Sequence, residues 1–290
     1  MAAPITLAPQ FARGRLVATH VTGREKQSFS VYSTDGRLVK RIHVEIPGAG
    51  RTIQSAVLPV KDGYVALAIA VRGSERDSVL CFLDRDGRLL KTAETRPFSP
   101  ELITVAADGC IWGFGSTNHA DVPTSDVPVL YRFSPSGEAL NKLLPRNLFG
   151  DFPPFAAGPD DTGMPALISA GNRVVLYAPQ TRSLYEIGLD GQVLGSYVVR
   201  IPDNLHPLRL AVTEDGAIYA RLVGGPARGI YELDRANSSW AAAPSDAMAA
   251  FASAALLGSD GDDLVLSIGR VNSGAEVIRV RLARRFATAP

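Results

Sequence analysis

The chain has 290 residues, of which 46% are hydrophobic, and its 30 Lys and Arg residues against 29 Asp and Glu residues give a formal net charge of +1. This balance, with no block of five like charges, argues against partners such as duplex nucleic acid or an acidic membrane surface. No stretch reaches the roughly 18 uninterrupted apolar residues that a membrane helix needs. We therefore expect no membrane span.

Short apolar runs joined by glycine-centred turns recur along the chain. In chain order, the turns fall at Gly36, Gly63, Gly87, Gly109, Gly137, Gly171, Gly191, Gly216 and Gly261. One series, which starts at Gly63, has intervals of 46, 62, 45 and 45 residues, and the other, which starts at Gly36, has intervals of 51, 50 and 54. Asp-Gly at such a turn predicts a two-residue hairpin, because Gly adopts positive φ freely and Asp tolerates it.

A period of about 40 to 50 residues made only of strands and turns is typical of a β-propeller. The sequence predicts an all-β, six-bladed β-propeller with four-stranded antiparallel blades, a to d, around a central channel, as a single domain over 1–290. The blades are expected at 5–46, 55–95, 101–144, 165–199, 207–241 and 251–290. In blade 2 the expected strands are Ala56–Val60, Tyr64–Val71, Val79–Leu83 and Arg88–Glu94.

The two ends of the chain leave the closure of the ring open. Residues Ile5–Ala8 either pair within blade 6 or form strand a of blade 1, and we expect some pairing between the N- and C-terminal segments. The Ala-rich segment Pro244–Ser253 predicts a short helix between blades 5 and 6. Cys81 and Cys110 lie in apolar runs and are expected to be buried and unbridged.

The first residues, Met1-Ala-Ala-Pro, carry no basic region followed by an apolar one. We expect either a cytoplasmic protein or, as the preferred interpretation, a periplasmic or secreted protein whose signal has been removed. A monomer is expected.

Strand direction divides the loops of a propeller between two ends of each blade. The short Gly turns fall at one end, and the b-to-c loops and the d-to-a links between blades fall at the other, where function is expected. The interval of 62 residues contains the long segments 115–128 and 144–165. Their aromatic residues Phe149, Phe152 and Phe155 either roof a pocket over the channel mouth or only cover the gap between blades 3 and 4.

Polar residues near the start of strand a are the next candidates for the site. They are Arg51, Gln54, Glu101, Asp203, His206 and Arg209, joined by His119 and Asp121 from the long segment. If His206 and His119 both point inward, they provide a general acid or base, or hold a metal together with Asp121 or Asp203. The alternative is that these histidines are ordinary surface or hydrogen-bonded residues.

Arginines recur in the same loops, Arg146 and Arg209 among them, and indicate either an anionic ligand held by guanidinium groups or an ordinary charged surface. We find no phosphate loop, no His-Glu-x-x-His and no Gly-x-Ser-x-Gly motif in the sequence. No cofactor is expected, and a divalent metal is possible without a motif that supports it.

The segments Pro100–Gly113 and Pro207–Ala220 resemble the repeats of six-bladed propellers of the NHL type. The resemblance covers nearly the whole chain and implies a family of lyases, lactone hydrolases and exported proteins of unknown role. It assigns no metal ligands here, because the acidic and Asn ligands of the lactonase branch have no matching positions. Members similar to virginiamycin lyase use channel histidines, and only His206 is placed roughly like one.

Two functions remain open. The preferred one is a non-catalytic propeller that binds a small molecule, peptide or protein at the channel mouth through ligand-binding candidates Arg51, Gln54, Glu101, Arg146, Phe152, Phe155 and Arg209. The alternative is a hydrolase or lyase in which His206 and His119 act as acid or base, Asp203 or Asp121 orients a histidine, and Arg51 or Arg209 binds substrate charge.

Overall fold

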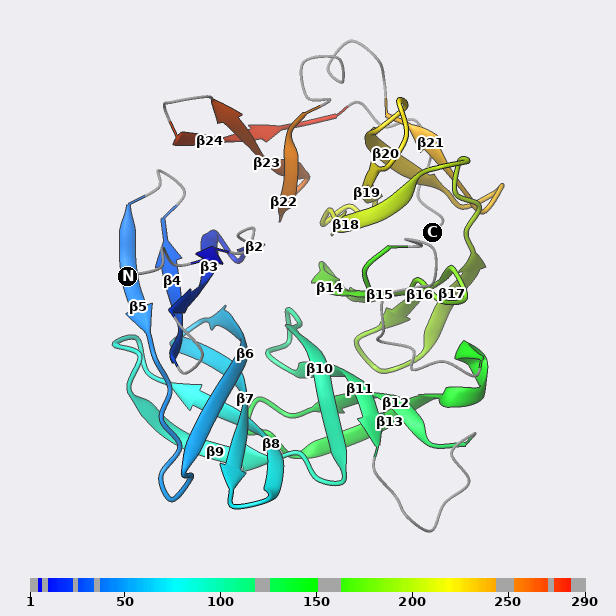
Figure 1. The fold of residues 1–290 in the computed structure, drawn as a ribbon. Coiled ribbons are helices and arrows are strands. Elements are labelled where there is room, and N and C mark those ends of the chain that lie inside the picture. The colour runs from blue at the N-terminus through cyan, green and yellow to red at the C-terminus, as the bar shows by residue number, and fades with distance from the viewer. Residues whose placement is uncertain are drawn as a thin grey trace. The chain divides into compact units, whose positions relative to one another are not determined.

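The computed structural model of the protein describes residues 5–6, 10–22, 26–33, 37–117, 126–150, 163–243, 253–270 and 274–282. Within these ranges the chain forms strands β1 to β24 and one 3₁₀ turn, η1 (Arg146–Phe149). The described strands make six antiparallel sheets, each from strands that follow one another in the chain (Figure 1). These sheets are the blades of a six-bladed β-propeller, so the predicted fold class is confirmed.

Blade 1 contains β1 (Ile5–Thr6), β2 (Gln10–Ala12), β3 (Arg15–Thr22), β4 (Lys26–Tyr32) and β5 (Leu38–Ile42). Blade 2 contains β6 (Arg51–Val60), β7 (Gly63–Arg72), β8 (Glu75–Leu83) and β9 (Leu89–Glu94), and blade 3 contains β10 (Phe98–Val105), β11 (Ile111–Thr117), β12 (Pro128–Phe133) and β13 (Ala139–Pro145). Blade 4 contains β14 (Ala166–Ala170), β15 (Arg173–Ala178), β16 (Ser183–Gly188) and β17 (Val193–Val198). Blade 5 contains β18 (His206–Val212), β19 (Ile218–Val223), β20 (Gly229–Asp234) and β21 (Ser239–Ala242), and blade 6 contains β22 (Ala255–Asp260), β23 (Asp263–Arg270) and β24 (Gly274–Val280).

Contacts divide the chain into two compact units, Met1–Val105 with Gly109–Arg146, and Ala106–Asp108 with Asn147–Pro290. The first unit holds blades 1 to 3, in which β6 lies beside β10. The second unit holds blades 4 to 6, in which β14, β18 and β22 follow one another as the strands a of successive blades (Figure 1).

The expected pairing of the N-terminal segment with the C-terminal one is wrong for the residues that the structure describes. Ile5 and Thr6 pair with Val21 and His20 of β3, and β2 continues along the same side of β3. Strand a of blade 1 is therefore made by β1 and β2, which was the other alternative. Both the C-terminal segment 283–290 and most of the predicted helix Pro244–Ser253 lie outside the described residues.

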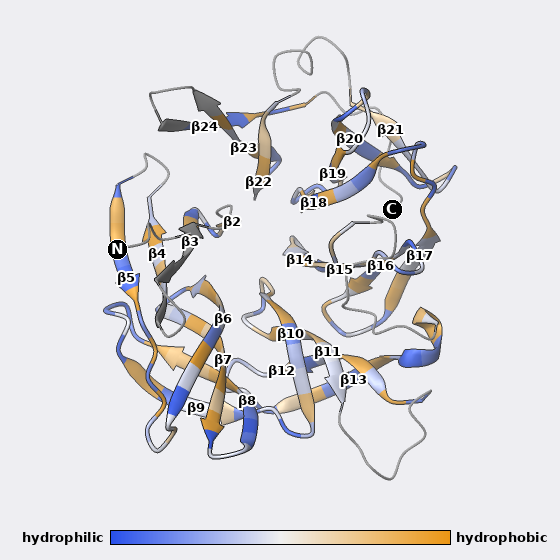
Figure 2. Ribbon diagram, in the orientation of Figure 1, coloured by the Kyte–Doolittle hydropathy of each residue, from blue (hydrophilic) through white to orange (hydrophobic). Residues whose placement is uncertain are grey.

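The strand β7 is buried on both faces, because blade 2 packs between blades 1 and 3. In β7, Ala66 and Ala68 pack in a cluster with blade 1, whereas Val65 and Leu67 pack in a cluster with blade 3. This alternation follows from the period of two residues in a strand. Figure 2 accordingly shows hydrophobic colour along the strands and hydrophilic colour at many of the turns.

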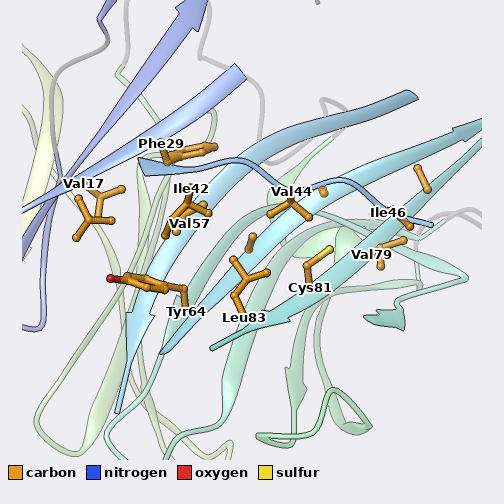
Figure 3. Packing of buried hydrophobic residues seen from close by; sticks show 14 residues of the cluster. Val17, Phe29, Ile42, Val44, Ile46, Val57, Tyr64, Val79, Cys81 and Leu83 are labelled. Carbon is orange, nitrogen blue, oxygen red and sulfur yellow. The ribbon is translucent and has the colours of Figure 1, made fainter. Parts of the chain in front are cut away.

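The core between blades 1 and 2 shows how the side chains of two sheets fill one layer. Val17, Phe29 and Ile42 of blade 1 meet Val57 and Tyr64 of blade 2 (Figure 3). Cys81 lies in the same layer, and both it and Cys110 are buried and form no disulfide, as predicted.

The glycine turns differ in one respect from the prediction. At the c-to-d turn of blade 4, the N–H of Gly191 donates to the carbonyl of Gly188 at 2.9 Å and the N–H of Gly188 donates to the carbonyl of Gln192 at 2.8 Å. Gly191 has a φ of +97°, but Asp190 is not among the residues with positive φ. The turn is therefore a type I turn followed by a left-handed Gly, and only the Gly needs positive φ.

Gly137 shows that one such turn also needs the absence of a side chain. Its φ is +92°, and a Cβ atom at this position would lie 2.6 Å from the Cβ of Ala93 in the neighbouring blade. Glycine is thus required at this turn both for its positive φ and because the neighbouring blade leaves no room for a side chain.

A buried ion cluster joins blades 4 and 5 at the end of the blades that carries the Gly turns. Glu186, whose side chain is 3% exposed, accepts from Arg173 at 2.7 Å and from Nε of Arg235 at 2.6 Å. Arg235 also donates to the carbonyl of Gly216 at 2.6 Å. Burial alone would raise the pKa of Glu186, but the hydrogen bonds and charges of Arg235 and Arg173 outweigh burial and lower that pKa.

A carboxyl whose pKa is lowered on folding stabilises the protein above its ordinary pKa near 4.5, and that stabilisation is lost as the pH falls through the folded value. We expect Glu186→Gln to lower the free energy of unfolding by about 3 to 5 kcal/mol at pH 7, because two partly buried arginines lose their charged partner. The variant should also lose part of the acid sensitivity below pH 4.5. Urea unfolding at pH 3 to 7 measures both effects, with the exposed Glu138→Gln as the control. Equal pH profiles for the two variants would contradict this role.

Candidate functional site

Four of the predicted site residues fall outside the part of the chain that the structure describes: His119, Asp121, Phe152 and Phe155. The predicted lid and the predicted pair of histidines therefore stay predictions. The remaining candidates are divided between the two units, with Arg51, Gln54, Glu101 and Arg146 in the first and Asp203, His206 and Arg209 in the second.

In the first unit, strand a begins earlier than predicted, so Arg51 and Gln54 lie within β6 and not in the loop before it. Gln54 is 2% exposed, and its Nε2 donates to the carbonyl of Val44 at 3.2 Å and lies 3.4 Å from Nδ1 of His43. This amide joins blade 2 to the link that follows blade 1. Its surroundings are those of a residue that holds two blades together.

Glu101 and Arg146 take positions set by the backbone. Glu101 lies inside β10, between Pro100, which pairs with Gly115, and Leu102, which pairs with Phe114. Partial burial raises the pKa of the Glu101 carboxyl. Arg146 begins η1, and its N–H donates to the carbonyl of Val127 at 3.0 Å.

In the second unit, His206 is the first residue of β18, Arg209 lies three positions further on, and Asp203 is exposed in the link before the strand. A β-bulge at Leu208 separates the two. Pro207 pairs with Leu222, and the next pair is Arg209 with Arg221. The structure thus places a second arginine, which the sequence analysis did not single out, directly opposite Arg209.

The bulge decides which face the side chains occupy. His206 pairs with Val223 and Arg209 pairs with Arg221, and Val223 and Arg221 are two positions apart on β19. Residues two apart on a strand lie on one face of the sheet. The extra residue in β18 therefore places His206 and Arg209 on the same face, although three positions would otherwise put them on opposite faces.

This face of blade 5 is the one that packs toward blade 6. Ala211 and Tyr219, the next residues on the same face, share a cluster with Leu256 of blade 6, whereas Leu210 and Ala220 belong to the cluster with blade 4. The two arginines lie beyond Ala211 and Tyr219 toward the end of the blade that carries the b-to-c loop, which we call the b–c end. At its b–c end, the apolar layer between blades 5 and 6 therefore gives way to the charged side chains of Arg209 and Arg221.

Other blades carry no charged side chains at the same place. The inner strand has the same bulge in blades 2, 3 and 6 of the described chain, and the pair that follows it is Ala56 with Leu67, Leu102 with Phe114, and Gly258 with Val265. In blade 5 this pair is Arg209 with Arg221. The repeat itself therefore shows that two arginines stand where blades 2 and 3 have apolar pairs and blade 6 has a glycine opposite a valine.

A third arginine lies at the b–c end of the same blade. Arg228 immediately precedes β20, and Ile230, two positions on, pairs with Arg221 and packs toward blade 6. Arg228 is exposed and its N–H closes a turn onto the carbonyl of Gly225 at 3.3 Å. We define the blade 5 arginine cluster as Arg209, Arg221 and Arg228, one residue from each of three neighbouring strands or their ends.

The electrostatic state of the cluster reflects its burial. Arg221 is 6% exposed and Arg209 is half-buried. Burial lowers the pKa of both guanidinium groups, and the charge of Arg228 lowers that of Arg221 further. Like charges directly opposite on a sheet are destabilising. The folded environment therefore disfavours the charged form of both guanidinium groups.

His206 is held beside the cluster by the loop after β19. Gly224 has a φ of +117°, and a Cβ atom there would lie 2.4 Å from the carbonyl oxygen of Asn204 and 3.2 Å from Nδ1 of His206. Only a glycine allows the loop to approach the start of β18 so closely. The histidine ring therefore lies against the b-to-c loop that leads to Arg228.

Two further observations concern metal ions and membranes. Among the described residues, no three His, Cys, Asp or Glu side chains are grouped so that they would hold a metal ion. No helix in the described ranges is long and apolar enough to cross a membrane.

No family model and no curated protein matches the chain. Several solved structures are similar to it in fold. A candidate exported protein from Bacteroides fragilis NCTC 9343 is 14% identical with a TM-score of 0.55, over 90% of this chain and 78% of that one. Puromycin hydrolase is 14% identical with a TM-score of 0.53, over 94% of this chain and 43% of that one. Catalytically inactive virginiamycin B lyase from Staphylococcus aureus with quinupristin is 13% identical with a TM-score of 0.50, over 90% of this chain and 76% of that one. At such identities the similarity shows the fold.

Because the folded environment lowers the pKa of Arg221, it disfavours the charged side chain. We expect Arg221→Met, which keeps the length of the side chain, to leave the free energy of unfolding unchanged or to raise it by up to about 1 kcal/mol. Urea unfolding at pH 7 measures this. Arg76→Met, at an exposed position of the b–c end of blade 2, is the control and should stay within about 0.5 kcal/mol of the wild type. A loss of 3 kcal/mol or more in Arg221→Met would instead identify Arg221 as a structural residue.

Proposed function

We propose that the chain is a non-catalytic, ligand-binding propeller that holds an anionic group of a small molecule at the b–c end of blade 5. The observation that carries this proposal is the pair of Arg209 and Arg221, opposed in register at a position where other blades have apolar pairs. Guanidinium groups present flat, paired donors that match carboxylate and phosphate oxygens.

An anion between the two guanidinium groups would reduce the repulsion between them, because like charges directly opposite each other on a sheet are destabilising. The proposal agrees with the sequence-based interpretation in which Arg209 binds ligand charge, and it replaces a site spread over many loops by one face of one blade.

A hydrolase or lyase is the second candidate, and one observation favours it. The bulge in β18 places His206 on the face that carries Arg209, so an anion bound there lies near an imidazole that can act as a general acid or base. Hydrolysis of carboxylate-bearing esters or lactones by the wild type, abolished in His206→Gln, would establish this candidate in place of the binding function.

Isothermal titration with sodium sulfate, sodium phosphate and sodium acetate at low ionic strength tests the binding function. We expect at least one of these anions to bind with a stoichiometry of one, and Arg221→Met to weaken that binding by about 10- to 100-fold, because one charged hydrogen-bonded contact contributes about 1.5 to 3 kcal/mol. Arg76→Met is the matched control and should bind like the wild type. Binding that Arg221→Met and Arg76→Met leave equally intact, or no binding at all, would overturn the proposal.

A further inference from the structure

The outer strand of blade 4, β17, ends its sheet with an edge that no described strand covers. The order of the sheet is β14-β15-β16-β17, so β17 pairs with a strand on one side only. The N–H of Val199 donates inward to the carbonyl of Arg182 at 2.9 Å. Since successive residues of a strand direct their backbone groups to opposite sides, Ser196 and Val198 direct theirs outward. The edge therefore presents hydrogen-bonding groups to a further strand.

The chain itself shows that this side of the strand accepts another segment. Arg200 is the next residue that directs its backbone groups outward, and it forms a parallel bridge with Ser239 of blade 5. The N–H of Arg200 donates to the carbonyl of Ser238 at 2.7 Å, and the N–H of Trp240 donates to the carbonyl of Arg200 at 3.2 Å. Backbone pairing on this side thus already occurs at one end of β17.

The side chains of β17 differ from those of the outer strands of blades 1 and 2. Its residues, Val193–Val198, include no charged one. Gly195 follows a bulge, and the same place holds Lys40 in blade 1 and Lys91 in blade 2. A lysine on an exposed edge opposes pairing with another strand, because its charge would have to leave water. Blade 4 lacks this protection.

Large aliphatic side chains are exposed along the same strand. Val193 is 46% exposed, Leu194 53% and Val198 69%. In blade 2 the place of Val198 is taken by Glu94, because both lie three positions after the residue that follows the bulge. Apolar side chains beside outward backbone groups favour a partner strand that is itself apolar.

The size of this edge favours an extended segment over a second folded copy. Residues Leu194–Val198 span about 17 Å, whereas a stable interface between folded proteins uses about 20 to 30 residues on each side. A segment that adds a strand gains its affinity from main-chain hydrogen bonds and its specificity from alternate side chains. It therefore needs no larger surface than β17 provides.

Charge completes the description of the partner. Arg182 and Arg200 are both exposed at the C-terminal end of β17. Their positive charges favour acidic residues in a segment that lies beside Val198. In the antiparallel arrangement, which is the more stable one, these acidic residues precede the apolar part of the partner segment.

We propose that the outer edge of β17 binds an extended segment of a partner protein by antiparallel strand addition. The segment has apolar residues at alternate positions, preceded by acidic residues. Its backbone bonds to Ser196 and Val198, and its apolar side chains contact Leu194 and Val198. This interaction surface does not rest on the proposed anion binding by blade 5.

The test uses the full chain and a fluorescein-labelled peptide, Glu-Glu-Val-Thr-Val-Thr-Val with a C-terminal amide. A second peptide has two lysines in place of the two glutamates, and fluorescence anisotropy measures the binding of both at low ionic strength. We expect the acidic peptide to bind and the lysine peptide to bind at least about tenfold more weakly, with a smaller difference in about 0.5 M sodium chloride. Equal affinities of the two peptides at low salt would overturn the assigned charge of the partner.

The variants Val198→Lys and Ser196→Pro locate the site. Lysine places a charge on the edge and proline removes an outward N–H, so each should weaken binding of the acidic peptide at least about tenfold. The controls are Leu90→Lys and Thr92→Pro in β9 of blade 2. Leu90 is 68% exposed, and Thr92 directs its backbone groups outward as Ser196 does. Both controls should bind like the wild type, and circular dichroism checks that each variant is folded.

Two results would contradict the proposal. One is peptide binding that Val198→Lys and Leu90→Lys leave equally strong, or no peptide binding at all. The other is a wild-type dimer, detected by sedimentation, that Val198→Lys dissociates, because the occupant of the edge would then be a second copy of the chain.

Discussion

One extra residue in an inner strand determines the chemistry of this propeller. The bulge at Leu208 leaves that residue outside the ladder between β18 and β19 and reverses the alternation of faces. His206 and Arg209 then share a face, and Arg209 stands opposite Arg221. Without the bulge, one of these two side chains would point toward blade 4, into an apolar cluster that contains Leu210 and Leu222. The site therefore depends on backbone register before it depends on any particular charge.

The bulge is a structural device of the repeat, and blade 5 uses it differently from the others. In blade 2 the pair after the bulge contributes Leu67 to the apolar layer shared with blade 3, and in blade 3 the corresponding pair contains Phe114; both side chains are almost completely buried. Blade 5 gives up this apolar contact at its b–c end. Its stability comes from elsewhere in the unit, from the cluster around Tyr219 and Leu256 and from the ion pairs of Glu186 with Arg173 and Arg235. Because the unit packs well at these two places, it tolerates the two opposed arginines at the b–c end of blade 5.

The sequence predicts the blades well, because the glycine turns recur at regular intervals and can be recognised without knowing how the side chains pack. It predicts the site poorly for two physical reasons. A bulge changes the face of every residue before it, and the segment Pro207–Arg209 gives no separate signal for it. Arg221 lies within the otherwise apolar run Ala217–Val223, so nothing in the sequence around it suggests a site. Only an alignment of Pro207–Ala220 with Pro100–Gly113 shows that the residue that follows each segment is Arg221 in one and Phe114 in the other. Gln54 is the opposite case: its polar side chain suggested a ligand site, and in the structure it is buried and donates to the carbonyl of Val44 between blades.

The central claim is that Arg209 and Arg221 together form one anion site on a single face of blade 5. A crystal structure of the protein grown from ammonium sulfate tests it most directly. Our account predicts a sulfate whose oxygens lie within hydrogen-bond distance of both guanidinium groups. Arg209 and Arg221 on opposite faces of the β18–β19 hairpin, or an Arg221 that is fully engaged by Glu232 while sulfate binds elsewhere, would contradict it.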